Sequence, residues 1–230
     1  MDPKQAYRNL RFGVGRLVQE LEEVEHLAGL TERFLQEEHG SFEKWLETEA
    51  AELSEEDQET LVEQHSDREW ELKEVFPALI RSSLLLSAFA MVEDYVVRAA
   101  DLVHAVMQLR LSRKDLKGSG IVQAHTYLSK VARLPLEPSD ETWKDVDLLR
   151  EIRNSFAHAR GRISGNDTLK RAIESHEHLR VDSRSRILLN STFLPWALDI
   201  LVVFAFSLDE ALTKVPPVPG AFPERPKRDA

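Results

Sequence analysis

Residues 151–161, EIRNSFAHARG, hold the residue types best suited to chemistry, because Arg153, Asn154 and His158 stand in an otherwise apolar helical segment. A guanidinium can bind a phosphate through two parallel hydrogen bonds, and an imidazole can exchange a proton near neutral pH. His158 could take the proton of a ribose 2′-hydroxyl or protonate the leaving 5′-oxygen, while Arg153 stabilises the charge on the phosphate. Asn154 could orient the ring or the phosphate. This chemistry requires no metal ion.

Helical geometry separates the members of this motif. Asn154 and His158 are four residues apart and share a face, with Arg150 one turn earlier on the same line. Arg153 precedes His158 by five residues, which is about 140° around a helix that turns by about 100° per residue. Three solutions are open: the arginine side chain curls round, the helix ends near His158, or a second chain completes the site.

The segment resembles the R-x4–6-H motif of HEPN-domain ribonucleases, in which a polar residue often follows the arginine. The resemblance extends over roughly residues 79–212 and includes LLLSAFAMVEDYVVRAADL, KGSGIVQAHTYLSK and WKDVDLLREIRNSFAHARG, in that order. It implies an all-α bundle of up-and-down antiparallel helices. It also implies a homodimer, in which the motif helices of two protomers pack side by side and the paired motifs line one cleft.

The same resemblance implies which residues act. Arg153 and His158 would be the catalytic residues, supported by Asn154, with RNA as the substrate and with neither a cofactor nor a metal ion. Arg150, Arg160 and Arg162 would help to hold the RNA backbone.

Glu93 is the carboxylate to follow in the long apolar helix, because it lies on an apolar face one turn from Phe89 and Val97. A buried acid needs a cation or hydrogen-bond donors, and Arg153 could supply them. The alternative is a glutamate at the edge of the helix that reaches water.

Three functions remain open. The first is a metal-independent endoribonuclease, whose role as a toxin or phage-defence effector, with an antitoxin or regulatory protein as partner, follows from family analogy alone. The second is a non-catalytic HEPN-like module that binds a nucleotide or a partner protein. The third is a structural helical protein in which Arg153 only pairs with Glu93.

The charge of the chain is unevenly spread. The net charge is −10, but residues 1–78 carry 21 acidic and 8 basic side chains, whereas residues 79–230 carry 19 and 22. A negative chain is unsuited to a large non-specific nucleic-acid surface. Residues 150–186, however, hold nine bases against five acids, so a local basic site is open.

Composition also limits the environment of the protein. The absence of cysteine excludes disulfides and thiolate zinc sites. The N-terminus lacks the basic-then-apolar pattern of a signal peptide. The apolar segment 193–208 contains Pro195 and Asp199 and is shorter than the about 20 residues of a spanning helix. We therefore expect a cytoplasmic protein without a membrane partner.

Apolar residues recur at steps of three and four, which predicts an all-α fold in three parts. Residues 1–77 form an acidic N-terminal extension, 78–213 the HEPN-like bundle and 214–230 a proline-rich flexible tail. The extension contains a helix over residues 5–38, with a seam at Leu10, Val14, Leu17, Leu21 and Val24, and an acidic helical region over 41–76 that Pro77 breaks or kinks.

The bundle begins with a central core helix over residues 79–111 and a shorter helix over 121–134. Ser139 is the expected N-cap of the motif helix and Gly161 its C-cap. Helices are also expected over 167–179 and 187–212. His176 and His178 fit a solvated helix better than a metal pair, and His104 and His125 fit core positions.

Overall fold

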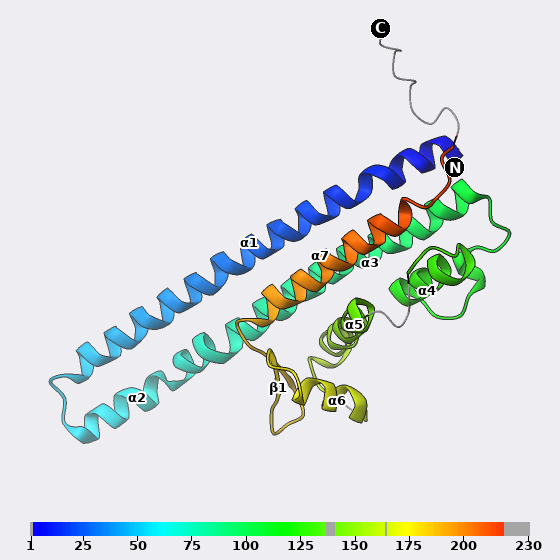
Figure 1. The fold of residues 1–230 in the computed structure, drawn as a ribbon. Coiled ribbons are helices and arrows are strands. Elements are labelled where there is room, and N and C mark those ends of the chain that lie inside the picture. Colours follow the sequence, from blue (N-terminus) through cyan, green and yellow to red (C-terminus); the bar gives the residue numbers. More distant parts are fainter. Residues whose placement is uncertain (1, 137–140, 164, 219–230) are drawn as a thin grey trace, which may run out of the picture. The chain divides into compact units, whose positions relative to one another are not determined.

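The computed structural model describes residues 2–136, 141–163 and 165–218. Helices make up most of this part of the chain, which confirms the all-α prediction, and one small two-stranded sheet accompanies them (Figure 1). The expected N-cap Ser139 and most of the proline-rich tail lie outside the described residues.

Two very long helical stretches form the first half of the chain. Helix α1 spans Pro3–Ala50, and after a turn the chain continues through α2 (Glu55–Trp70), the π-helical turn η1 (Glu71–Val75) and α3 (Phe76–Met107). Ser54 caps α2, because its hydroxyl accepts the N–H of Asp57 at 3.3 Å. Every residue of the predicted seam on α1 is buried: Leu10, Val14, Leu17, Leu21 and Val24.

Shorter elements follow. They are η2 (Arg113–Asp115), α4 (Gly120–Thr126), the π-helical turn η3 (Tyr127–Val131), α5 (Glu141–Ala159), α6 (Asp167–Glu174) and α7 (Phe193–Leu212). Between α6 and α7 lies an antiparallel hairpin of β1 (Leu179–Val181) and β2 (Ile187–Leu189). The hairpin buries Leu179, Ile187 and Leu189 and exposes Arg180 and Leu188.

The chain divides into two compact units. The first comprises Met1–Glu22, Ser87–Arg150 and Leu198–Ala230, and its core includes Phe89, Tyr127, Leu149 and Leu201. The second comprises Glu23–Leu86 and Glu151–Ala197, and its core includes Leu35, Ile152, Ile173 and Phe193. Each unit therefore takes residues from both sides of residue 77, where the sequence analysis placed a boundary.

A half-buried ion pair ties three elements of the second unit together. The guanidinium of Arg81 on α3 donates to both carboxylate oxygens of Glu32 on α1, at 2.6 and 2.8 Å. A third N–H donates to the backbone carbonyl of Leu189 on β2 at 2.7 Å. Arg81 thereby anchors the hairpin to the long helices.

Several expected boundaries were wrong. The expected gap between residues 38 and 41 does not exist, because α1 runs unbroken to Ala50. Pro77 does not end the helix, because α2, η1 and α3 form one continuous stretch, and the distortion directly before the proline is the π-helical turn Glu71–Val75. The helix expected over 167–179 ends at Glu174, and residues 187–189 form a strand.

One helical stretch of the described chain, Glu55–Met107, is long and apolar enough to meet a length-and-composition test for a membrane span. Core helices of soluble proteins also meet that test, so it is weak evidence for a membrane.

Candidate active site at the end of helix α5

The motif residues lie on one continuous helix that is fixed by its apolar side. Val146, Leu149 and Ile152 of α5 are fully buried and supply the core contacts expected of that stripe. His158 lies in the last turn of α5 and is exposed, while Arg153 and Asn154 are half-buried. The helix therefore presents the imidazole to solvent on a rigid support.

Helix α5 ends immediately after the histidine. Arg160 and Gly161 both take the left-handed conformation, with φ of 53° and 76°. The N–H of Gly161 donates at 2.9 Å to the carbonyl of Ser155, six residues earlier, and so satisfies a carbonyl of the last helical turns. Because α5 extends to Ala159, Arg153 and His158 both lie on the regular helix and keep their offset around it. Gly161 was expected at the C-cap, but Arg160 is the first left-handed residue.

Arg153 and His158 differ in burial, as their offset on the helix predicts. A guanidinium N–H of Arg153 (Nη1) donates to the side-chain oxygen of Asn154 at 3.0 Å, so the arginine orients the amide. The amide group of Asn154 thus keeps its NH2 for another acceptor. Asn154 and His158 share a face of α5, one turn apart.

A cavity of about 220 Å³ lies beside this part of α5. Its polar lining comes from Glu151, Asn154 and Ser155 on α5, Arg162 after the helix and Asn166 before α6. Asn166 is also the N-cap of α6, since its side-chain oxygen accepts the N–H of Leu169 at 3.0 Å. The cavity thus combines a carboxylate with an amide, a hydroxyl and a guanidinium, and the last three are groups that hydrogen-bond phosphate and ribose.

The remaining predicted support residues have varied surroundings. Arg160 and Arg162 are exposed, as RNA contacts require. Arg150 donates to the carboxylate of Asp147 at 2.7 Å. The carboxylate of Glu93 accepts the N–H of Ile121 at 3.1 Å, at the start of α4, so it satisfies a helix N-terminus. The pairing of Glu93 with Arg153 stays a prediction.

Sequence reasoning missed Asn166, Ser155 and Glu151 as lining residues. Asn166 carried a signal, because asparagine directly before Asp167 and the apolar Leu169 is a recognisable helix start. Ser155 and Glu151 carried none, since they are ordinary polar residues of a helix.

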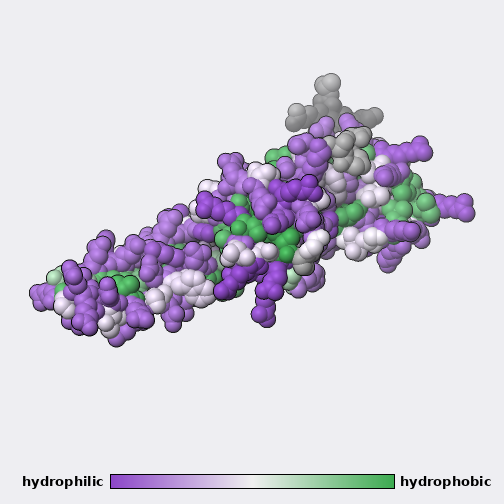
Figure 2. Space-filling view, turned by 90° about the horizontal axis from the view of Figure 1, so that it is seen from below, coloured by the Kyte–Doolittle hydropathy of each residue, from purple (hydrophilic) through white to green (hydrophobic). Residues whose placement is uncertain are grey.

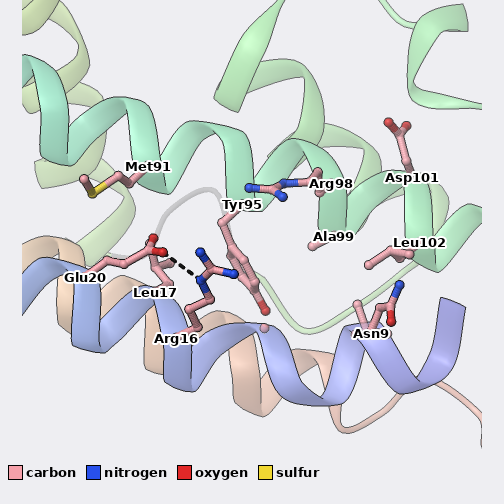
Figure 3. Close-up of a pocket in the computed structure, with 12 residues that line it drawn as sticks. Asn9, Arg16, Leu17, Glu20, Met91, Tyr95, Arg98, Ala99, Asp101 and Leu102 are labelled. Atoms are coloured by element: carbon pink, nitrogen blue, oxygen red, sulfur yellow. Dashed lines mark hydrogen bonds and ion pairs between the residues drawn. The ribbon is translucent and has the colours of Figure 1, made fainter. Parts of the chain in front are cut away.

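A cavity of the first unit lies between α1 and α3 and measures about 470 Å³ (Figure 3). Its charged groups are mutually paired: Arg16 with Glu20 at 2.8 Å, Arg98 with Asp94, and Asp101 with Arg113 at 2.8 Å. An anionic or cationic ligand would have to compete with these partners, so we do not place the active site there.

The other histidines have structural surroundings. His125 is buried and its ring stacks on Trp143 with centroids 3.7 Å apart, which confirms a core position. His176 and His178 follow α6 and contact Trp196, so the expected solvated helix is wrong at these positions. Among the described residues no group of three or more His, Cys, Asp or Glu is arranged to hold a metal ion.

Comparison with models of protein families, with curated proteins and with solved structures finds no match to this chain.

Proposed function

We propose that this chain is a metal-independent endoribonuclease of the HEPN type that acts as a homodimer. The observation that carries the proposal is the end of α5: an exposed His158 in the last turn, one turn from Asn154, which Arg153 orients and which lines a polar cavity. Asn154 and Arg162 line the cavity and can donate to a phosphate, and His158, which does not line it, lies one helical turn from Asn154 and can act as general acid or base.

In the proposed reaction His158 takes the proton from a ribose 2′-hydroxyl. The 2′-oxygen attacks the adjacent phosphorus, and the bond from phosphorus to the 5′-oxygen breaks. A protonated imidazole, supplied by the second protomer, gives its proton to the leaving 5′-oxygen. Arg153 stabilises the added negative charge on the phosphate, and Asn154 holds a non-bridging oxygen or the imidazole. The products carry a 2′,3′-cyclic phosphate and a 5′-hydroxyl.

The homodimer is part of the proposal because of the offset between Arg153 and His158. On one helix they are about 140° apart, so one protomer does not easily direct both at the same phosphate. Two motif helices side by side can supply the arginine of one chain and the histidine of the other.

The first test is incubation of the full chain with total RNA and tRNA in EDTA. We expect cleavage by the wild type and none by His158→Ala or Arg153→Ala. His26→Ala is the matched control, because His26 is also an exposed helical histidine but lies on α1. Cleavage by His158→Ala at the wild-type rate would reject the mechanism. RNA binding without cleavage by any form would favour the non-catalytic module.

A second test addresses the composite site. Equal amounts of wild-type and His158→Ala protein are mixed under conditions that exchange subunits. Because the proposed reaction uses the imidazoles of both protomers, only the quarter of the dimers with two wild-type chains should cut RNA, and activity should be about a quarter of that of an all-wild-type sample. About half of that activity, despite exchange shown by a tagged subunit, would place the histidine chemistry within one protomer.

The toxin or phage-defence role, an antitoxin or regulatory partner and a cytoplasmic location belong to the same proposal. Growth arrest on expression that His158→Ala relieves would support the toxin role. Normal growth with active enzyme would count against it.

A further inference from the structure

Three arginines share the exposed face of a small β-structure that follows the motif helix. In the hairpin, Arg180 on β1 pairs with Leu188 on β2. Arg186 lies two residues before Leu188 and therefore points to the same face. Arg162 pairs with Arg186 through an isolated antiparallel bridge. Cross-strand partners lie on one face, so Arg162, Arg186 and Arg180 share it, with Asp182 beside Arg186. We call these three arginines the arginine face.

The bridge places two like charges at the closest cross-strand distance. The N–H of Ile163 donates to the carbonyl of Ser185, and the N–H of Ile187 donates to that of Gly161, both at 2.8 Å. These bonds flank Arg162 and Arg186, which are therefore a non-hydrogen-bonded pair, the kind whose side chains approach most closely. Like charges directly opposite each other destabilise a sheet, and a bound anion would relieve that cost.

Among the described residues, one acidic side chain pairs with the arginine face. Arg162 and Arg180 are exposed, and neither forms an ion pair within the part of the chain that the structure describes. Arg186 pairs with Asp182 at 2.8 Å, and its side chain is still 45% exposed. The space-filling view shows hydrophilic side chains over much of the viewed surface, with apolar patches among them (Figure 2).

The arginine face shares one residue, Arg162, with the candidate active site. Arg162 both pairs with Arg186 and lines the cavity that contains Asn154. A strand of phosphates lying on Arg180, Arg186 and Arg162 would therefore enter the cavity beside α5.

We propose that the arginine face binds the phosphate backbone of single-stranded RNA and guides it to α5. This proposal rests on the proposed function. Guanidinium groups bind phosphates bidentately, and a short row of three suits one strand better than the grooves of a duplex. Leu188, 37% exposed among the arginines, offers an apolar contact for an unpaired base.

The test measures binding apart from cleavage. In the His158→Ala background, the fluorescence anisotropy of a short labelled single-stranded RNA is followed in EDTA at rising KCl. The test variant carries Arg162→Gln and Arg180→Gln, which leave the Arg186–Asp182 pair intact. The control carries Arg33→Gln and Lys44→Gln, which remove the same charge from exposed positions on α1 of the same unit. Circular dichroism melts check that both variants fold.

We expect the test variant to lose at least about tenfold in RNA affinity, and the slope of log affinity against log salt to fall by about 1.4, or 0.7 for each lost phosphate contact. The control should bind like the parent. If the test variant fails to fold, Arg180→Gln and Arg162→Gln are measured singly, each with an expected slope change of about 0.7. Equal losses in test and control, no RNA binding by the parent, or stronger binding to phosphatidylserine vesicles than to RNA would overturn the proposal.

The two proposals fail separately. If the wild type leaves RNA intact while the test variant loses RNA affinity, RNA binding by the arginine face is supported and the nuclease activity is rejected. If the wild type cuts RNA and the test variant binds RNA like the parent, the nuclease activity is supported and RNA binding by the arginine face is rejected.

Discussion

The ring of Phe156 lies directly against Gly161, and its Cε1 atom is 2.7 Å from the place that a Cβ atom on residue 161 would occupy. This contact lies at the C-terminal end of α5, where the ring of Phe156 packs on Gly161, the residue at which the chain leaves the helix. It thereby sets the path from His158 to Arg162.

Replacing Gly161 by alanine should destabilise the protein for two reasons. The φ of 76° costs an L-residue about 1 kcal/mol, and displacing the Phe156 ring adds about 1–3 kcal/mol. Gly165→Ala is the control, because Gly165 has φ of 69° but nothing within 4 Å of an added Cβ. Urea unfolding should therefore show the larger loss for Gly161→Ala. Equal losses would mean that the Phe156 contact contributes nothing.

Gly13 and Gly15 on α1 should respond to alanine with opposite signs. A Cβ at Gly13 would lie 2.6 Å from the ring of Tyr95, whereas one at Gly15 meets nothing within 4 Å. Gly15→Ala should stabilise the helix by about 0.5–1 kcal/mol. In Gly13→Ala the same gain is outweighed by a packing cost of about 1–3 kcal/mol. Thermal melts of both variants test this, and Gly13→Ala combined with Tyr95→Leu should recover stability.

The Arg81–Glu32 pair should matter more than a surface ion pair. Its side chains are only 14% and 19% exposed, so Glu32→Gln removes the negative charge and one of the two acceptor oxygens from a poorly solvated guanidinium. We expect a loss of about 1–3 kcal/mol in urea unfolding. Glu20→Gln, which breaks an exposed pair with Arg16 on the same helix, should cost less than about 1 kcal/mol. A Glu32→Gln loss as small as that of Glu20→Gln would show that the pair is not needed to anchor the hairpin.

The hairpin turn should loosen in acid. The backbone N–H of Arg186, helped by its guanidinium and by the N–H of Arg184, holds the pKa of Asp182 below its ordinary value of 3.8. Because the folded pKa is the lower one, the stabilisation is complete above about pH 4 and is lost as the pH falls through the depressed value. Amide exchange of Arg184 and Arg186 should accelerate there. Asp182→Asn should remove that pH dependence, and its persistence would assign the loosening to another group.

The sequence predicted the helices where their apolar period was long. The seam from Leu10 to Val24 is buried throughout, because steps of three and four over several turns define one face of a helix. The same holds for Phe89, Val92 and Val96 in α3. Boundaries were less predictable: the expected helix end near residue 38 does not exist, and α1 continues to Ala50, with Phe42 and Trp45 in contact with His65 of α2.

The hairpin could not be predicted from its pattern. Each strand has three residues, which is too short for a recognisable alternation, and Ile187–Leu189 merged with the apolar run of α7. The polar turn from Asp182 to Arg186 was its only signal. The sequence showed that residues 150–186 are rich in arginine. The alignment of Arg162, Arg180 and Arg186 on one face depends on strand pairing, which the periodicity of the sequence does not predict.

The π-helical turn Glu71–Val75 has a consequence for how this chain tolerates changes in length. A π turn holds one residue more than the α-helical turn it replaces. Deleting one residue from η1 would convert it to a regular turn without interrupting the helix. The segments on either side would keep nearly the same rotation about the helix axis, because the π turn already accommodates the extra residue locally. A deletion from the regular part of α2 would instead rotate the preceding residues by about 100° relative to α3. This stretch can thus lose one residue at η1 and keep the same side of α2 directed at α1.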